Sequence, residues 1–455
     1  GALLALAGPC LFFGGLIHKA CLDLFLMSAL LYMLARLLDE ASPRRGWALA
    51  TGAVLGALTL TRENALLLFP LLAVVLGIAL AGRGARLAVG LFLLGGVLAL
   101  APVALRNYAV GGELVLTTSQ FGANFYLGNN AQADGTYEPL VYGHGDVANE
   151  HADAIALAEQ AAGRKLTAGE VSHYWSSRAW AWMSAHPGDW ARLLVHKWRL
   201  VWSAREISDS DEILVYEDAS VLLRALTTLF GFGTFAALAA VGMATTWPQR
   251  RRVGFLYVIV GGLAAATALF FVFGRYRVAL FPPLALFAAA GLGQLVALPR
   301  TRPRPRVLAG YVGIGVAAAI ATSLPLGGNG DGVRRGTAYY NVAVTQEAGG
   351  DLPAAMASYR RSLAFDATSV QAHINLGALL ARGGAFGEAI AEERAALGLR
   401  PDDVLAHVDL ANALLESGRL DEAEPHYREA LRLEPEQPQA RAGLMTLQDL
   451  RANPR

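Results

Sequence analysis

Residues 175–202 read WSSRAWAWMSAHPGDWARLLVHKWRLVW and contain six of the chain's eight tryptophans. Tryptophan favours the boundary between membrane and water, where its ring is buried while its N–H stays hydrated. The stretch is the second half of a polar segment at 106–219, and apolar runs of membrane length flank that segment on both sides. The pattern predicts a domain that lies on one membrane face over the ends of apolar helices, with any catalytic or recognition site between the two.

The composition is that of a mosaic of membrane-like and water-soluble parts. Apolar residues make up 54% of the chain and charged residues 16%, against roughly 25% charged residues in a soluble domain. The net charge of +1 gives no bulk attraction for nucleic acid. The only cysteines, Cys10 and Cys21, fall inside apolar runs, so no disulfide framework and no zinc site of the usual cysteine type is expected.

Nine apolar runs are candidate membrane spans, because roughly 20 apolar residues cross the bilayer core. The expected spans are residues 1–17, 20–38, 46–61, 64–81, 87–105, 221–246, 253–273, 277–298 and 307–325. They divide the chain into five parts. These are membrane helices at 1–105, an outer loop domain at 106–219, further membrane helices at 220–326, a linker at 327–335 and a repeat tail at 336–455.

Basic residues in alternate short loops predict the orientation of the spans, since such residues stay on the cytoplasmic side. The residues concerned are Arg44, Arg45, Arg83, Arg86, Arg250, Arg251, Arg252, Arg300, Arg302, Arg304 and Arg306. The remaining turns, the 106–219 domain and everything after Pro325 are then expected to face outward. We therefore expect a multi-pass inner-membrane protein whose loop domain and repeats are periplasmic.

Three outward turns nevertheless carry cations. They hold Lys19, Arg62 beside Glu63, and the run Arg275-Tyr276-Arg277. Such cations cost insertion energy unless an anion meets them. Snorkelling of long side chains at helix ends is the alternative explanation for any one of them. For three turns on one face we favour a shared anionic ligand, such as a lipid-linked phosphate, bound by Lys19, Arg62, Arg275, Tyr276 and Arg277.

The first part of the loop domain, Thr117 to Tyr142, reads as strand and turn, because Asn-Asn and Asp-Gly pairs are turn signals. It predicts either a polar hairpin or a loop that presents amides and acids to a sugar. Candidate sugar or acceptor contacts are Asn129, Asn130 and Tyr137.

From Thr167 the pattern becomes helical, and Thr167 with Glu170 forms a capping-box signature. A second helix is expected from Pro187, amphipathic and interfacial in composition. The predicted loop domain is thus α/β, within a mainly α-helical chain.

The tail is a repeat array. Small residues recur 34 positions apart in two series, Ala343, Gly377 and Ala411, and Ala355, Ala389 and Ala423. Pro401 and Pro435 close the second and third units. This is the tetratricopeptide pattern of paired helices that cross closely at small residues. Three repeats with a cap from Glu436 onward predict a stable α-solenoid.

Several segments at about 1–300 together resemble one family of membrane enzymes. They are Leu60-Thr61-Arg62-Glu63-Asn64, Arg106-Asn107-Tyr108, Leu127-Gly128-Asn129-Asn130, Lys197 to Trp202 with Glu206, and Gly274-Arg275-Tyr276-Arg277 followed by Phe281-Pro282. The order and outward placement of these segments resemble the dolichyl-phosphate-mannose–protein mannosyltransferase-like members of the GT-C glycosyltransferases. The pairing with tetratricopeptide repeats is similar to that of eukaryotic transmembrane O-mannosyltransferases, at the level of architecture.

The resemblance implies transfer of a sugar from a polyprenyl-phosphate donor to a protein, lipid or glycan acceptor at the outer face. Members of the family keep a catalytic acid in the first outward loop, whereas the turn at His18-Lys19 has none and Asp23 follows one helical turn later. Because the sequence starts without Met inside an apolar run, we expect that a missing segment carried this acid. The displacement would be inverting, with cations stabilising the leaving phosphate.

The base that takes the acceptor proton stays open among Glu63, Asp134 and Glu206. No cofactor is expected, although a divalent cation stays open.

Two other classes of function compete with the transferase. The first is a membrane-anchored scaffold whose repeats dock a partner protein, since repeat arrays are binding modules by default. The second, a transporter of lipid-linked sugars, is disfavoured because the ionisable residues lie at helix ends and transport sites usually lie near mid-span.

Overall fold

The computed structural model describes residues 2–15, 19–39, 45–113, 115–118, 120–137, 139–141, 147–207, 213–301, 305–324 and 331–452. The chain divides into two compact units. The first comprises Gly1–Ile207 and Ser220–Leu326, and the second comprises Ser208–Ala219 and Gly327–Arg455. In none of the described ranges does the chain form a β-strand, and the regular elements are all helices.

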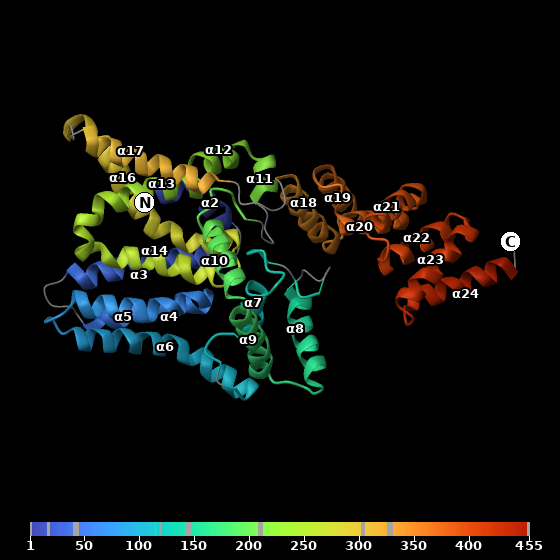
Figure 1. Cartoon of the computed structure of the whole chain (residues 1–455), viewed down its shortest axis with the longest axis horizontal. Coiled ribbons are helices and arrows are strands. Elements are labelled where there is room, and N and C mark those ends of the chain that lie inside the picture. The colour runs from blue at the N-terminus through green and yellow to red at the C-terminus, as the bar shows by residue number, and fades with distance from the viewer. Residues whose placement is uncertain are drawn as a thin grey trace. The chain divides into compact units, whose positions relative to one another are not determined.

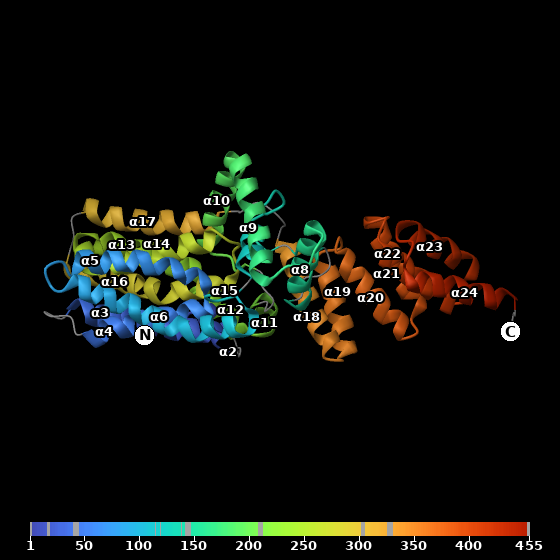
Figure 2. The same ribbon diagram turned by 90° about the horizontal axis from the view of Figure 1, so that it is seen from below.

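The apolar runs of the first unit are helical, as expected. Their helices are α1 (Ala2–Leu6), α2 (Gly8–Gly15), α3 (Lys19–Asp39), α4 (Arg45–Thr61), η1 (Glu63–Leu67), α5 (Leu68–Ala79), α6 (Ala85–Gly111), α12 (Val221–Leu229), α13 (Phe232–Thr246), η2 (Trp247–Gln249), α14 (Arg250–Ala268), α15 (Gly274–Arg277), η3 (Val278–Leu280), α16 (Phe281–Thr301) and α17 (Pro305–Ser323). The long helices among them run side by side (Figure 1; Figure 2).

Five helical runs of the described chain are long and apolar enough to cross a membrane, judged by length and composition. They are Lys19–Asp39, Ala85–Gly111, Val221–Ala268, Gly274–Ala297 and Pro305–Ser323. Insertion into a membrane stays a prediction.

Glycines allow the closest helix contacts in this unit. A Cβ placed on Gly52 of α4 would lie 1.8 Å from the carbonyl oxygen of Phe92 in α6, and one on Gly95 would lie 2.0 Å from that of Leu49. Gly242 of α13 approaches Phe287 of α16 in the same way, at 1.8 Å. Small residues that let two backbones approach are typical of packing between membrane helices.

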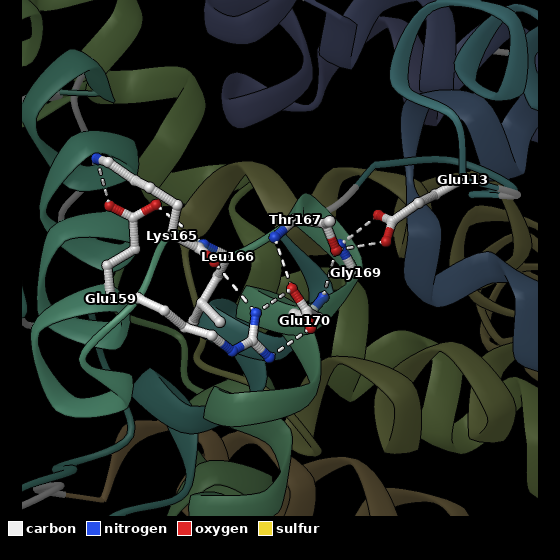
Figure 3. Close-up of polar contacts among 8 residues, drawn as sticks. Glu113, Glu159, Lys165, Leu166, Thr167, Gly169 and Glu170 are labelled. Carbon is white, nitrogen blue, oxygen red and sulfur yellow. Dashed lines mark hydrogen bonds and ion pairs between the residues drawn. The ribbon is translucent and has the colours of Figure 1, made fainter.

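The polar segment forms α7 (Phe121–Gly128), α8 (Val147–Ala162), α9 (Ala168–Ala185) and α10 (Pro187–Val201). These helices gather at one end of the long helices (Figure 1; Figure 2). The predicted capping box is confirmed, because Thr167 accepts from Glu170 N and the Glu170 side chain accepts from Thr167 N. Figure 3 shows that Glu113, just after α6, also accepts from Thr167 Oγ1 and Gly169 N, at 2.5 and 2.6 Å.

The prediction of strand and turn at 117–142 is wrong for the described residues, and with it the α/β character of the loop domain. Phe121 and Phe125 stack one turn apart in α7, with ring centroids 5.8 Å apart. The Asn-Asn pair ends this helix. The side-chain amide of Asn129 donates to Phe125 O, and that of Asn130 donates to Tyr126 O. The turn signal was therefore a helix terminus whose orphan carbonyls are bound by side chains.

The second unit consists of α11 (Ile213–Ala219) and a stack of paired helices. The stack comprises α18 (Asp331–Ala348), α19 (Leu352–Phe365), α20 (Val370–Arg382), α21 (Phe386–Leu399), α22 (Val404–Glu416), α23 (Leu420–Leu433) and α24 (Pro438–Ala452). The alanines of the 34-residue pattern are fully buried between these helices, including Ala343, Ala389 and Ala423.

The boundaries of this unit differ from the predicted domains. Helix α18 starts at Asp331, inside the linker expected at 327–335, of which residues 327–330 lie outside the described residues. Helix α11, from the end of the predicted 106–219 domain, packs on α18. There Asp218 accepts two 3.0 Å hydrogen bonds from Arg335 and one of 2.9 Å from the hydroxyl of Tyr339.

Candidate functional site

Two of the predicted cationic turns meet in the first unit around an aspartate. Arg62 follows α4, and its Nε donates to Asp23 Oδ2 in α3 at 2.5 Å. Its Nη2 donates to the carbonyl oxygen of Arg275 at 3.0 Å, and its guanidinium carbon lies 4.9 Å from the ring centroid of Tyr276. Arg62 and Asp23 are both buried. An ion pair of this depth is costly unless further polar contacts support it.

Lys19 completes this group, which we call the basic cluster: Lys19, Asp23, Arg62, Arg275 and Tyr276. The ammonium of Lys19 lies within electrostatic range of both arginines and of Asp23. The guanidinium of Arg275 lies over the rings of Phe273 and Tyr276, at 5.2 and 5.7 Å. Lys19 thus lies near Arg62, Arg275, Asp23 and Glu63, and a cluster that gathers three cations can accept an anion.

Asp23 has an unused acceptor. Its Oδ1 is buried and has no hydrogen-bond partner. Buried polar atoms are paired in the great majority of cases, and an orphan calls for an explanation. Sequence reasoning noted Asp23 only for its position after the first outward turn, because its contact with Arg62 joins residues 39 positions apart in the chain.

Glu150 is a second acid that sequence reasoning missed. It lines a cavity of about 100 Å³ together with His151, Asn124 and Gln120. Burial raises the pKa of Glu150, while the nearby hydroxyl of Tyr137 and the charge of Arg275 act in the opposite direction. Of the predicted sugar contacts, Tyr137 therefore lies near the basic cluster. No local pattern marked Glu150, which is an ordinary acid in the first turn of α8.

Arg277 has a different environment from Arg275. Its Nη1 donates to Ser203 O at 2.5 Å, and its Nη2 donates to Arg205 O and to Glu206 Oε2, at 3.0 and 2.7 Å. Arg277 is fully buried. Its terminal nitrogens thus hold the end of α10 to α15, and the predicted catalytic acid Glu206 is the counter-ion of this contact.

Asn129 is committed to internal bonds. Its Oδ1 accepts from Lys197 Nζ at 3.1 Å and from Trp190 Nε1 at 3.2 Å, and its Nδ2 donates to Phe125 O and Leu269 O. Lys197 is fully buried, and this burial lowers its pKa to about 7. The structure therefore uses all the hydrogen-bonding capacity of the Asn129 amide inside the protein.

The remaining predicted residues make local contacts. Asn130 Oδ1 accepts from Gln132 N, and Asp134 Oδ1 accepts from Thr136 N and Oγ1, so both side chains shape turns. Asp134 is exposed, and Glu63 is half-buried at the start of η1.

A second candidate site is the face formed by the first helices of the repeats. Helix α20 contacts α22, and α22 contacts α24, in addition to the contacts within each helix pair. First helices that touch in this way lie on the inner side of a curved stack, the side that solenoids use for binding. Leu405 is exposed on α22 and Val344 on α18, the first helix of the first pair, while Asn341, Asn375 and Asn412 are half-buried on α18, α20 and α22. We call these five residues the inner face.

Comparisons with known proteins bear on the repeats only. Residues 404–437, which span α22 and α23, match the tetratricopeptide repeat family, and the repeat prediction is confirmed there. No curated protein matches the chain at a significant level. The resemblance of residues 1–300 to glycosyltransferases therefore stays a prediction.

The solved structures that match include three tetratricopeptide domains. The Arabidopsis OM64 domain is 19% identical, covering 26% of this chain and 98% of its own, with a TM-score of 0.25. The first such domain of Spaghetti (RPAP3), bound to the HSP90 peptide SRMEEVD, is 19% identical, covering 26% and 95%, with a TM-score of 0.26. The P58(IPK) domain is 14% identical, covering 96% and 100%, with a TM-score of 0.25.

Proposed function

We propose that this chain is a membrane-anchored interaction protein whose tetratricopeptide array binds an extended segment of a partner protein. The observation that carries the proposal is the inner face. Exposed Val344 and Leu405 offer apolar contact on it. Asn341, Asn375 Oδ1 and Asn412 Nδ2 offer amide groups that can pair with a peptide backbone, while Asn375 Nδ2 and Asn412 Oδ1 are bonded to tyrosine hydroxyls. The apolar helices of the first unit would hold this array at a membrane.

A random peptide library presented to the full-length protein in detergent tests the proposal. We expect enrichment of one consensus sequence. Val344→Asp and Leu405→Asp should weaken its binding at least tenfold, because each places an unpaired charge in the contact. Ala391→Asp, at an exposed position of the second helix α21, is the matched control and should bind as the wild type does. Absence of any consensus, or equal loss in the control, contradicts a binding role for the inner face.

A second function, transfer of a sugar from a polyprenyl-phosphate donor, is supported by the basic cluster. Lys19, Arg62 and Arg275 come from three separate turns and converge, as a phosphate site requires. An acceptor hydroxyl would attack the anomeric carbon as the bond from that carbon to the phosphate oxygen breaks. Asp23 or Glu150 would take the hydroxyl proton. The cations would stabilise the charge left on the phosphate.

Binding of undecaprenyl phosphate to the protein in detergent tests this second function. Each charge-assisted contact contributes about 1.5–3 kcal/mol, so Arg275→Ala should weaken binding by about tenfold to a hundredfold. Arg86→Ala, at an exposed position in a loop expected on the cytoplasmic side, should leave it unchanged. Equal affinity of the wild type and Arg275→Ala would return Arg275 to the snorkelling explanation.

A further inference from the structure

Glu393 interrupts a regular feature of the repeats. The positions 34 residues before and after it hold Tyr359 and Tyr427, and both tyrosines are fully buried. Tyr359 donates its hydroxyl proton to Glu347 at 2.9 Å, and Tyr427 donates to Asn412 at 2.7 Å. In the flanking repeats, this position therefore links a second helix to the first helix of the same pair.

Glu393 makes no such link. It is fully buried on α21, and neither of its carboxyl oxygens has a hydrogen-bond partner. Gly377 on α20 makes room for it, since a Cβ at residue 377 would lie 2.2 Å from Glu393 Oε1. An unpaired acid in a repeat core is costly, and an aromatic residue fits the same position in the neighbouring repeats. Packing alone therefore does not account for an acid at this position.

A second acid lies beside it. Asp409 is half-buried on α22, three residues before Asn412 of the inner face, and it is the charge that acts most strongly on Glu393. In the described part of the chain, Asp409 has neither a salt bridge nor a side-chain hydrogen bond. Burial, together with nearby acids, raises the pKa of Glu393 to about 10 and that of Asp409 to about 6. No neighbouring cation lowers either value.

The basic groups nearby are paired with other acids. Arg400 binds Asp403 at 3.3 Å, and His373 binds Glu392 at 2.6 Å. Asp403 and Glu392 are the other acids whose charge acts on Glu393. Each of them is paired with one of these two basic residues. The outer acids of this group thus have basic partners, and the inner two have none in the described part of the chain.

We propose that the inner face binds a partner segment through one arginine or lysine, which enters at Asp409 and is held between Asp409 and Glu393. The inference rests on the proposed interaction function and specifies the partner's chemistry. Asp409 is partly exposed and forms the entrance, while Glu393 forms the base of the site. A guanidinium has five donors in a planar fork and can serve both carboxyl groups at once. Its charge favours the ionised form of Glu393, whose proton passes to the solvent on binding.

The test uses the consensus peptide from the library and the same peptide with its arginine replaced by citrulline, or its lysine by norleucine. Fluorescence polarisation with the full-length protein should give a tenfold to hundredfold weaker affinity for the neutral peptide, because a charge-assisted contact is lost. Asp409→Asn should weaken the charged peptide to a similar extent and leave the neutral peptide unchanged.

Glu393→Tyr is the second variant, because it installs the residue of the flanking repeats and should fold well. It should lose the preference for the charged peptide. Glu434→Gln removes an exposed acid of the same unit and is the control, with affinity within twofold of the wild type. A consensus without a basic residue overturns this inference and leaves the interaction function standing. A preference for the charged peptide that survives in both variants has the same two consequences. Absence of any consensus overturns both.

Discussion

Glu393 and Lys197 are buried ionisable residues without a counter-ion, whereas Asp23 and Arg277 are buried with one. The pKa values of the first two shift mainly through desolvation, upward for the acid and downward for the amine. Asp23 and Arg277 instead join distant segments, α3 to the turn after α4 and α15 to the end of α10. The two partnered residues thus connect segments far apart in the chain, and the unpartnered Glu393 is the one for which we propose a ligand.

The raised pKa of Glu393 predicts how the stability of the repeats depends on pH. An unfolded glutamate has a pKa of about 4.3, and the folded value is about 10. The folded state therefore binds the proton more tightly. The resulting stabilisation is complete below about pH 4 and is lost as the pH rises towards 10. One proton of difference lowers the free energy of unfolding by about 1.4 kcal/mol per pH unit in between.

Urea unfolding of the full-length protein, followed by circular dichroism, measures this dependence. The range from pH 6.5 to 9 is used because Asp409, with a raised pKa of about 6, adds a dependence of the same sign at lower pH. Glu393→Gln should make the slope more positive by about 1.4 kcal/mol per pH unit, while Glu434→Gln should keep it. Lys197, with a lowered pKa of about 7, adds a dependence of the opposite sign that is common to all three proteins. A slope that is the same in all three proteins would show that Glu393 is ionised throughout.

At the scale of the element, the sequence predicted those helices whose packing follows from the pattern of apolar and small residues. The apolar runs and the 34-residue pattern each became helices at the expected places. Helix α7 was not predicted, because the turn signal of Asn129 and Asn130 is the same for a hairpin and for a helix end. Contacts with distant segments decide between a hairpin and a helix end. Gly122 lies against Ser172 of α9, and Gly128 lies against Phe270, which no local rule could supply.

Gly52 gives a prediction for the contact between α4 and α6. Gly52→Ala places a methyl group 1.8 Å from the carbonyl oxygen of Phe92, so the helices must separate. Overpacking of this kind costs about 1–3 kcal/mol, and we expect a lower melting temperature for the protein in detergent. Gly90→Ala in the same α6 is the control, because nothing lies within 4 Å of its added Cβ. Equal melting temperatures for the two variants would mean that α4 and α6 do not pack this closely.

At the scale of the whole molecule, the candidate site was predictable in part. The cations of three turns were expected to meet, and Lys19, Arg62 and Arg275 do lie together. The acids near them were not identified. The contact of Asp23 with Arg62 and the electrostatic interaction of Glu150 with Arg275 join segments far apart in the chain. Patterns in a single sequence report only neighbours. For the same reason the contact of α11 with α18 was not expected.

The alternation of arginine loops predicts that the polar segment and the repeats face the same side of the membrane. Single cysteines at Gln132, Glu436 and Ala81, all exposed, in a background without Cys10 and Cys21, report this in intact cells. An impermeant maleimide should label the first two positions and not Ala81, which lies in a loop expected on the cytoplasmic side. Labelling of only one of the first two would contradict the predicted topology.

The last prediction separates the two proposed functions by removing one unit. Deletion of residues 331–455 takes away the repeats together with α18, so Asp218 loses the partners Arg335 and Tyr339. Asp218→Asn in the truncated chain removes the charge that these two partners bind in the full-length protein. The basic cluster draws its residues from the first unit only. The truncated chain should therefore bind undecaprenyl phosphate within twofold of the full-length affinity and lose all binding of the consensus peptide. The full-length Asp218→Asn protein is the control and should bind both. If the truncated chain melts as a folded protein but no longer binds the lipid phosphate, the repeats take part in donor binding and the two functions share one site.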